Sequence, residues 1–494
     1  MWSGLGRPRL AVVVLSLCAL TASACSREVG PATVAGPVTH TTQPVPPHLV
    51  FTAQPTTATA GRVMDTVVVS VLDSAGGLVA LAGDTITIAV AAEPGPANLS
   101  GTLRAPVIGG VASFGDLSLD QPGGGYVLSA SSSDATVAAA TSMAIGIAWR
   151  ARSVTGSCAL TETGAAWCWG HDEYGQLGNG TATSSLAAQP VPVSGGLTFA
   201  SLSQGARHNC GVTAAGELWC WGNNMQGELG VGDQSARTTP VRVGGGLTFT
   251  SVAAGDEYTC GLVASGAAYC WGYNHYGELG DGTDTTRLTP VPVAGGLRFA
   301  ALAAQRFHTC GVALDGSVWC WGDNTFGQLG TGDESPRNAP VQVQGVGALS
   351  AVSVSWDYTC GLGSGKVYCW GFIPLVANVG DGGLSYAAPT LMPMSAAAQA
   401  LGVSQTTACA STAGAKLLCW GFVGAGPKPD NSSIVVDHPV AVGTEVPLVS
   451  FVVGSPYPCG VSADGTAWCY AYAESGTPAA GDTVRYLPKR IALY

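Results

Sequence analysis

Pairs of cysteines recur along this chain with a period of about fifty residues. The first cysteines of successive pairs are 52, 50, 50, 50, 49 and 50 residues apart, and the members of one pair are nine or ten residues apart. The pairs are Cys158 and Cys168, Cys210 and Cys220, Cys260 and Cys270, Cys310 and Cys320, Cys360 and Cys369, Cys409 and Cys419, and Cys459 and Cys469. A fixed period of this length is typical of a repeat protein in which each repeat folds as one small unit.

Each cysteine pair flanks a short turn, such as Asp315-Gly316, that allows the chain to fold back as a hairpin. Cysteines ten residues apart across such a turn face each other on adjacent antiparallel strands, where the Cβ separation is close to what a disulfide needs. We therefore predict one disulfide inside each repeat. Each is expected to contribute about 3 kcal/mol to stability in the chain-entropy account.

Histidines two residues before a cysteine raise the alternative of zinc binding. They are His208 and His308, and other repeats carry tyrosine at the equivalent place, at Tyr258, Tyr358 and Tyr457. Tyrosine substitutes for histidine in packing and hydrogen bonding but not in zinc ligation, and the chain has no C-x-x-C motif. We therefore expect these histidines to be structural and expect no metal at them.

Each complete repeat contains four short segments with strand character. In the third repeat the apolar segment GGLTFTSVAAG precedes the cysteine strands YTCGLVA and AAYCWG, and the loop YGELGDGT leads to TPVPVAGG. One such unit cannot shield its apolar face alone, whereas a closed ring of units can. We predict an all-β fold in which residues 147–494 form a seven-bladed β-propeller with four-stranded antiparallel blades. The final segment, YLPKRIALY, either completes the seventh blade or pairs near Trp149.

The motif W-G-x-N-x-x-G-[QE]-L-G-x-G follows the second cysteine at Trp221, Trp271 and Trp321, with a near-complete copy at Trp169. With these motifs, residues 147–494 resemble the repeats of the regulator of chromosome condensation family. The resemblance implies a seven-bladed propeller, and it brings guanine-nucleotide exchange on a small GTPase as one functional alternative. The last three repeats depart from the pattern, since WGFIPLVANVGDGG, WGFVGAGPKPDNSS and CYAYAESGTPAAGDT lack most of the loop motif.

A different pattern precedes the repeats. Residues 48–146 alternate apolar and polar side chains in DTVVVSVLD, DTITIAV and GYVLSASSS, and they contain no cysteine. This alternation predicts a β-sandwich of short strands. The segment resembles the bacterial immunoglobulin-like domains of surface proteins, which implies a spacer or an adhesive unit, and we expect a spacer. Residues 25–47 are rich in threonine and proline, which predicts an extended tether.

The first 24 residues have the features of an export signal, because Arg7 and Arg9 precede the apolar run LAVVVLSLCALTA. Ala22-Ser23-Ala24 fits ordinary secretion, whereas the same residues with Cys25 resemble a bacterial lipobox. Of the 16 cysteines, Cys18 leaves with the signal and 14 pair in the repeats, so Cys25 has no partner. We therefore expect a lipid on Cys25 and an outer-membrane or cell-surface location, with free secretion as the alternative.

Charge and motif content disfavour several functions. The net charge of −11 becomes −13 once the two arginines of the signal are removed, and the remaining basic residues are dispersed. An acidic surface without a basic patch disfavours nucleic-acid binding. The segment CGLGSGKVYCW lacks the first glycine and the Ser or Thr of a phosphate-binding loop, so we predict a hairpin turn there. With no nucleophile elbow either, we predict no catalytic residues and no cofactor.

Large side chains vary between repeats at two loop positions, before the first cysteine and after the W-G step. An unchanging frame with changing aromatic and charged loop residues is what a binding face requires. The candidate residues are Tyr174, Arg207, Asp256, Glu257, Tyr273, His275, Tyr276, Arg306, Phe307, Phe326, Trp356 and Asp357. We expect a monomeric, non-catalytic propeller that binds a protein or glycan at the cell envelope. The alternatives are nucleotide exchange, inhibition of an enzyme, and a hydrolase or lyase acting on polysaccharide.

Overall fold

The structure is a computed structural model that describes residues 46–92, 97–121, 123–148, 150–374, 383–414, 416–424, 434–443, 446–453, 458–472 and 484–490. Within these ranges the chain is almost entirely β-strand, with one short 3-10 helix, η1 (Ala294–Gly296). The same ranges contain no helix long and apolar enough to cross a membrane. The predicted export signal, tether and lipid attachment at Cys25 lie outside the described residues.

Two β-sheets that share one hydrophobic core form the first part of the described chain. One sheet has the order β1 (His48–Ala53), β3 (Val67–Leu72), β7 (Val111–Phe114). The other has the order β2 (Thr57–Thr59), β11 (Ile145–Ala148), β9 (Gly123–Ser132), β4 (Thr85–Ala92), β6 (Arg104–Pro106), with β10 (Ala140–Thr141) paired to β9, while β5 (Leu99–Ser100) pairs with β8 (Ser118–Leu119). Side chains alternate between the two faces of a strand, so Val69, Phe114, Ile88 and Leu128 all point into the core.

The remaining described strands form sheets in which each strand pairs with its neighbour in sequence. The first three sheets are β12 (Ala151–Thr155), β13 (Cys158–Thr161), β14 (Ala166–Asp172), β15 (Thr183–Pro192); β16 (Phe199–Gln204), β17 (His208–Thr213), β18 (Leu218–Gly222), β19 (Arg237–Arg242); and β20 (Phe249–Ala254), β21 (Tyr258–Val263), β22 (Ala268–Gly272), β23 (Arg287–Pro292). The next two are β24 (Phe299–Gln305), β25 (His308–Ala313), β26 (Val318–Gly322), β27 (Arg337–Gln342); and β28 (Ala351–Val354), β29 (Tyr358–Gly363), β30 (Lys366–Pro374), β31 (Gly383–Leu391).

The last two repeats join in one eight-stranded sheet. It consists of β32 (Ala398–Val403), β33 (Thr407–Thr412), β34 (Leu417–Gly424), β35 (Ile434–Gly443), β39 (Val484–Arg490), β38 (Ala467–Tyr472), β37 (Pro458–Ser462) and β36 (Leu448–Val453), in that order. The final strand, β39, pairs with β38 of its own repeat and, in parallel, with β35. It therefore completes the last repeat, which is the first of the two alternatives that the sequence left open for this segment. Trp149, which the other alternative involves, lies outside the described residues.

The predicted disulfides are confirmed in all seven repeats. Each joins the second and third strands of its repeat, where the two cysteines are directly opposite each other in register. The Cα atoms of the bonded cysteines are 4.0–4.1 Å apart, and the sequence separation is nine residues in the fifth repeat and ten in the others. The shorter fifth hairpin turns at Ser364 and Gly365, which have φ values of 49° and 75°, so the predicted hairpin is also confirmed.

In the second, third and fourth repeats a tryptophan holds the sheet to the preceding one. Trp271 is fully buried, and its indole Nε1 donates a hydrogen bond of 2.9 Å to the carbonyl oxygen of Glu228, one repeat earlier. Trp321 makes the same bond to the carbonyl of Glu278 at 2.8 Å. The indole packs directly on a glycine, because a Cβ atom added to Gly280 would lie 2.7 Å from Trp321. This contact explains why an L-G step in the previous repeat matches four of the W-G steps, those at Trp221, Trp271, Trp321 and Trp370.

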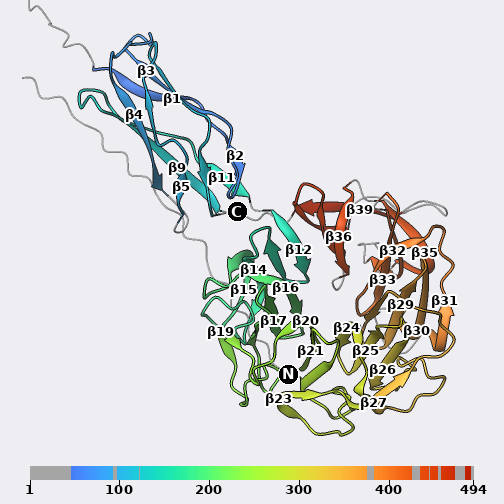
Figure 1. Cartoon of the computed structure of the whole chain (residues 1–494). Coiled ribbons are helices and arrows are strands. Elements are labelled where there is room, and N and C mark those ends of the chain that lie inside the picture. Colours follow the sequence, from blue (N-terminus) through green and yellow to red (C-terminus); the bar gives the residue numbers. More distant parts are fainter. Residues whose placement is uncertain are drawn as a thin grey trace, which may run out of the picture. The chain divides into compact units, whose positions relative to one another are not determined.

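The first and last repeats meet through the same kind of contact that joins the other sheets. The N–H of Phe249 donates to the carbonyl of Gly216 in the preceding repeat at 2.8 Å, and the N–H of Ala151 donates to the carbonyl of Gly465 at 2.7 Å. Val154 of β12 and Val461 of β37 lie in one buried cluster. In Figure 1 the sheets from β12 to β39 accordingly follow one another around a ring.

Candidate binding face

The two kinds of variable loop lie at the same end of the sheet in the second, third and fourth repeats. The register pairs His208 at the start of β17 with Gly222 at the end of β18, and it pairs His308 with Gly322 in the same way. The turn before the second strand and the loop after the third strand must therefore emerge side by side. We call the surface formed by these turns and loops the turn face. The predicted binding residues lie on it.

The third and fourth repeats bring four aromatic side chains together on the turn face. Tyr276 and Phe307 are closest, with ring centroids 5.0 Å apart, and Tyr273 lies 6.0 Å from Phe307. His275 packs edge-on against Tyr276 at 5.4 Å. The loop after the third strand of one repeat thus contacts the first turn of the next. We call these four residues the aromatic cluster.

Arg306 extends this cluster to the fifth repeat. Its guanidinium carbon lies 5.0 Å from the ring centroid of Phe307 and 4.6 Å from that of Trp356, and its Nη1 lies 3.5 Å from a carboxylate oxygen of Asp357. The φ of Arg306 is 39°, which is unfavourable for a residue with a Cβ atom. Burial raises the pKa of Asp256, and the charge of Arg306 opposes that effect. Arg306 therefore connects the acidic and aromatic parts of the face.

Other predicted residues form separate contacts at equivalent positions. The guanidinium carbon of Arg207 lies 5.1 Å from the ring centroid of Tyr174, two repeats before the cluster. Phe326 packs on Phe372, with centroids 5.7 Å apart. The sequence prediction missed Phe372, although it directly follows a W-G step and is therefore equivalent to Tyr273.

A carboxyl or amide side chain is buried below each of these loops. Glu228, Glu278 and Gln328 have no exposed surface, and each accepts a hydrogen bond from the backbone N–H two residues earlier. The second polar atom has a partner in two repeats, since Asn223 donates to Glu228 at 2.5 Å and Gln328 donates to Asp323 at 2.8 Å. Burial raises the pKa of Glu228 to about 7 and that of Glu278 to about 8.

Glu278 differs from its equivalents because Tyr273 occupies the position of the asparagine or aspartate. As a result, Oε1 of Glu278 has no hydrogen-bond partner among the described residues. Tyr273 is also close enough to Glu278 and Glu257 for their charges to add to the effect of burial and raise the pKa of its phenol. The aromatic cluster thus lies beside two carboxyl groups.

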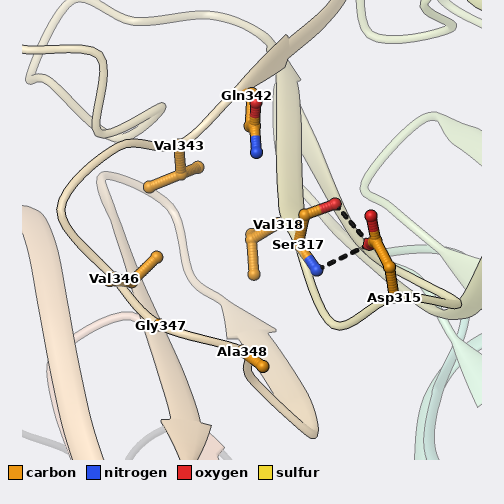
Figure 2. Close-up of a pocket in the computed structure, with 8 residues that line it drawn as sticks. All are labelled: Asp315, Ser317, Val318, Gln342, Val343, Val346, Gly347 and Ala348. Carbon is orange, nitrogen blue, oxygen red and sulfur yellow. Dashed lines mark hydrogen bonds between the residues drawn. The ribbon is translucent and has the colours of Figure 1, made fainter.

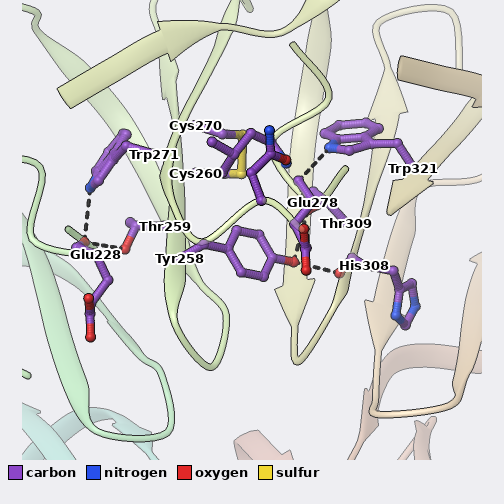
Figure 3. The surroundings of a disulfide bond; sticks show 12 residues. Glu228, Tyr258, Thr259, Cys260, Cys270, Trp271, Glu278, His308, Thr309 and Trp321 are labelled. Carbon is purple, nitrogen blue, oxygen red and sulfur yellow. Dashed lines mark hydrogen bonds between the residues drawn. A yellow bond between two sulfur atoms is a disulfide. The ribbon is translucent and has the colours of Figure 1, made fainter. Parts of the chain in front are cut away.

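The histidines and tyrosines before the cysteines serve packing between sheets. The side chain of His308 is fully buried, and its Nε2 lies 2.8 Å from the hydroxyl of Thr359 in the next repeat, while burial lowers its pKa to about 4. Tyr258 donates to the carbonyl of His308 at 2.6 Å, a contact that Figure 3 shows beside the disulfide of the third repeat. The described residues contain no group of three or more His, Cys, Asp or Glu side chains arranged to hold a metal.

The opposite end of the fourth repeat contains a cavity of about 220 Å³. Figure 2 shows Val318, Val343, Val346 and Gly347 around it, while Asp315 bonds to Ser317 of its own turn. The equivalent of Gly347 in the preceding repeat is Leu297, which packs against the core there. The cavity therefore lies where the preceding repeat has a leucine and this repeat has Gly347, with Val346 packed against the core beside it.

Comparison with known sequences identifies the repeat. A profile of the regulator of chromosome condensation (RCC1) repeat matches residues 215–262, 265–312 and 315–362. A second profile of this repeat matches residues 156–176, 199–228, 249–278 and 300–328. Together the matched residues cover less than half of the chain, and they lie where the W-G motif is best preserved.

Curated relatives share short stretches with the chain. The ultraviolet-B receptor UVR8 of Arabidopsis thaliana is 36% identical over 77 residues, which are 16% of this chain and 18% of the receptor. Human protein RCC2 is 33% identical over 87 residues, or 17% of each protein. The chain thus spans less than a fifth of the length of these relatives.

Solved structures resemble the chain over a larger part. Prp20p from Saccharomyces cerevisiae superposes with a TM-score of 0.56 at 19% identity, covering 67% of this chain and 87% of Prp20p. Human WBSCR16 superposes with a TM-score of 0.53 at 20% identity, covering 60% of this chain and 83% of that structure. At such identities the likeness concerns the fold. The chain therefore carries RCC1 repeats, and its repeat region folds as a β-propeller.

Proposed function

We propose that the turn face of this propeller binds another macromolecule at the cell envelope and that the protein has no catalytic activity. The observation that carries the proposal is the contact series from Tyr276 through Phe307 and Arg306 to Trp356, which spans three consecutive repeats. Tyrosine, tryptophan and arginine are the residues most enriched at the centres of binding surfaces. Disulfides inside every repeat support a location outside the cytosol.

The same proposal includes the arrangement of the whole chain. Seven cysteine pairs at a constant period support a seven-bladed ring, and the shared core of the first two sheets supports an immunoglobulin-like spacer before it. The lipobox-like sequence before Cys25 supports a lipid anchor, with residues 25–47 as tether. In this arrangement the anchor and spacer present the propeller to partners outside the cell, and free secretion is the alternative.

Affinity capture from envelope extracts tests the binding role. The mature chain serves as bait, and the double variant Tyr276→Ala/Trp356→Ala removes the side chains at the two ends of the contact series. We expect the parent, and not the double variant, to retain a specific partner. Leu314→Ala, an exposed position at the opposite end of the fourth repeat, is the control and should retain it. Identical captures by the parent and the double variant would refute a binding role for this part of the face.

Metabolic labelling with an alkyne fatty acid tests the anchor separately. The parent should incorporate the label and sediment with membranes, whereas Cys25→Ser should lose both properties. A parent that is unlabelled and recovered in the medium would establish free secretion instead.

Guanine-nucleotide exchange is a second candidate, which the RCC1 repeats favour. Prp20p, one of the structures that the chain resembles, has binding properties to Gsp1p and histones. Release of a fluorescent GDP analogue from a small GTPase measures the activity directly. We expect the mature chain to leave the rate of GDP release unchanged. A large acceleration would instead show that nucleotide exchange is the function of the protein.

A further inference from the structure

The repeats themselves indicate what the aromatic cluster lacks. Tyr174 and Tyr276 occupy equivalent positions after the W-G step, as do Arg207 and Phe307 before the cysteine. Tyr174 holds the guanidinium of Arg207 over its ring, at 5.1 Å from the centroid. In the third repeat the ring of Tyr276 meets Phe307 instead, at 5.0 Å. The same tyrosine position therefore holds a cation in one repeat and none in the other.

Neither Tyr273 nor Tyr276 takes part in a cation–ring contact with another described residue, because these contacts involve Tyr174, Phe307 and Trp356. Tyr276 is accessible, with 37% of its surface exposed. The rings of the cluster thus offer electron-rich faces that attract a positive charge.

Carboxyl groups beside the cluster also lack a cation. Tyr273 lies near Glu257 and Glu278, whose charges both act on its phenol. Oε1 of Glu278 has no hydrogen-bond partner among the described residues. Arg306 forms its ion pair with Asp357 and not with Glu257 or Glu278. The chain as a whole carries a net charge of −11, which further favours a positively charged ligand.

Arg306 illustrates how this face holds a guanidinium. It lies over the rings of Phe307 and Trp356 while a carboxylate oxygen of Asp357 is 3.5 Å from its Nη1. Two aromatic rings and one carboxylate therefore suffice here. Tyr273, Tyr276 and Glu257 supply the same types of group, since both tyrosine rings contact Phe307 and the backbone N–H of Tyr273 donates to the carbonyl of Glu257 at 3.0 Å.

We propose that the turn face binds a lysine or arginine side chain of a partner protein, over Tyr273 and Tyr276 and beside Glu257. This inference rests on the proposed binding function and adds the chemistry of the partner. Rings and carboxyl groups also recognise sugars, but here the rings meet at 42–79°, which gives no flat stacking platform. The carboxylate of Glu257 and the net negative charge of the chain favour a cation over a neutral glycan.

A peptide of alternating lysine and glycine with a fluorescent label is the probe, and anisotropy at low salt is the measurement. An otherwise identical peptide with acetylated lysines and the sugar chitohexaose are the comparison ligands. We expect only the lysine peptide to bind the parent. Tyr276→Ala should weaken binding about tenfold and Glu257→Gln about threefold, as for loss of a ring or a partly exposed charge.

Leu314→Ala is the control, because it removes an exposed side chain at the opposite end of the fourth repeat, and its affinity should equal that of the parent. Equal binding of the lysine and acetyl-lysine peptides, or unchanged affinity in Tyr276→Ala, would overturn the inference. Binding of chitohexaose in its place would assign the face to a glycan. If Tyr276→Ala does not fold, two comparisons decide the question. The first is between the lysine and acetyl-lysine peptides on the parent, and the second is between the parent and Glu257→Gln with the lysine peptide. The envelope capture is a separate experiment, so failure of the peptide test would not by itself refute the proposed binding function.

Discussion

The carboxyl group of Glu278 accepts a hydrogen bond of 2.9 Å from the backbone N–H of Tyr276, and its other oxygen has no partner among the described residues. In the next repeat Gln328 accepts the same backbone bond from Phe326 at 2.8 Å and donates a second one to Asp323. A neutral side chain thus fits this buried position at least as well as a carboxylate. Burial disfavours the charged form of Glu278 and raises the pKa of its carboxyl group from 4.5 to about 8.

Stability should therefore fall with rising pH. The native state retains the proton of Glu278 up to about pH 8, whereas the unfolded chain loses it near pH 4.5. Between these values each pH unit costs up to about 1.4 kcal/mol of unfolding free energy for this group. The Glu278→Gln variant removes this cost, so its unfolding temperature should exceed that of the parent at pH 8 and approach it near pH 4.5. Calorimetric scans across this pH range measure the difference.

The reverse exchange, Gln328→Glu, is the control for the preceding prediction. It places a carboxyl group in the fourth repeat, beside Asp323, and should make the decline with pH steeper than in the parent. Parallel pH profiles for all three proteins would show that the buried position does not retain a proton.

Gly280→Ala should destabilise the propeller by more than Gly282→Ala does. Both glycines have positive φ, 64° and 85°, so both substitutions strain the backbone by about 1 kcal/mol. Only the Cβ atom added at Gly280 would also collide with an indole, at 2.7 Å from Trp321, whereas Gly282 has open space. Urea unfolding should place Gly280→Ala below Gly282→Ala by about 1–3 kcal/mol. Equal losses would mean that the close glycine–tryptophan contact contributes nothing.

Filling the cavity of the fourth repeat should stabilise the protein. An added Cβ at Gly347 meets nothing within 4 Å, and leucine is the residue at this position in the preceding repeat. We expect Gly347→Leu to raise the unfolding free energy by about 1 kcal/mol, and Leu297→Ala to lower it by about 2 kcal/mol. Chemical denaturation of the two variants tests both signs, and a destabilised Gly347→Leu would show that the gap is needed.

Removal of one disulfide should lower stability without changing the others. Replacing Cys260 and Cys270 by serine opens a hairpin loop of about ten residues, for which a loss of about 2–4 kcal/mol is typical. Peptide mapping of the unreduced variant should still give the bonds of the remaining repeats. Bridges between different repeats in that map would contradict the pairing described above.

The sequence was sufficient for the parts of the fold that depend on local spacing. Cysteines ten apart around a glycine turn can meet only across one hairpin, so the pairing of Cys260 with Cys270 followed directly. The fifth hairpin was equally predictable, because Ser364 and Gly365 suit a tight turn. The repeat period also identified residues such as Tyr276 and Phe307 as variable positions on one scaffold.

Contacts between repeats were not predictable in the same way. That Tyr276 meets Phe307, 31 positions later in the sequence, depends on how one sheet packs on the next. Phe372 was missed because the fifth repeat loses the loop motif that marks the equivalent positions elsewhere. The burial of Glu278 was also missed, since glutamate in a glycine-rich loop is ordinarily exposed.

The bond from Ala151 to Gly465 repeats the bond from Phe249 to Gly216, although it joins the two ends of the repeat region. The circle therefore has no privileged seam between its first and last units. The repeats follow one another around the ring in sequence order, but the ring does not depend on which repeat comes first, so new chain ends placed in another inter-repeat link should give a circularly permuted protein with the same contacts. A gene built in this way can gain loop variants one unit at a time while the other units continue to hold the circle closed.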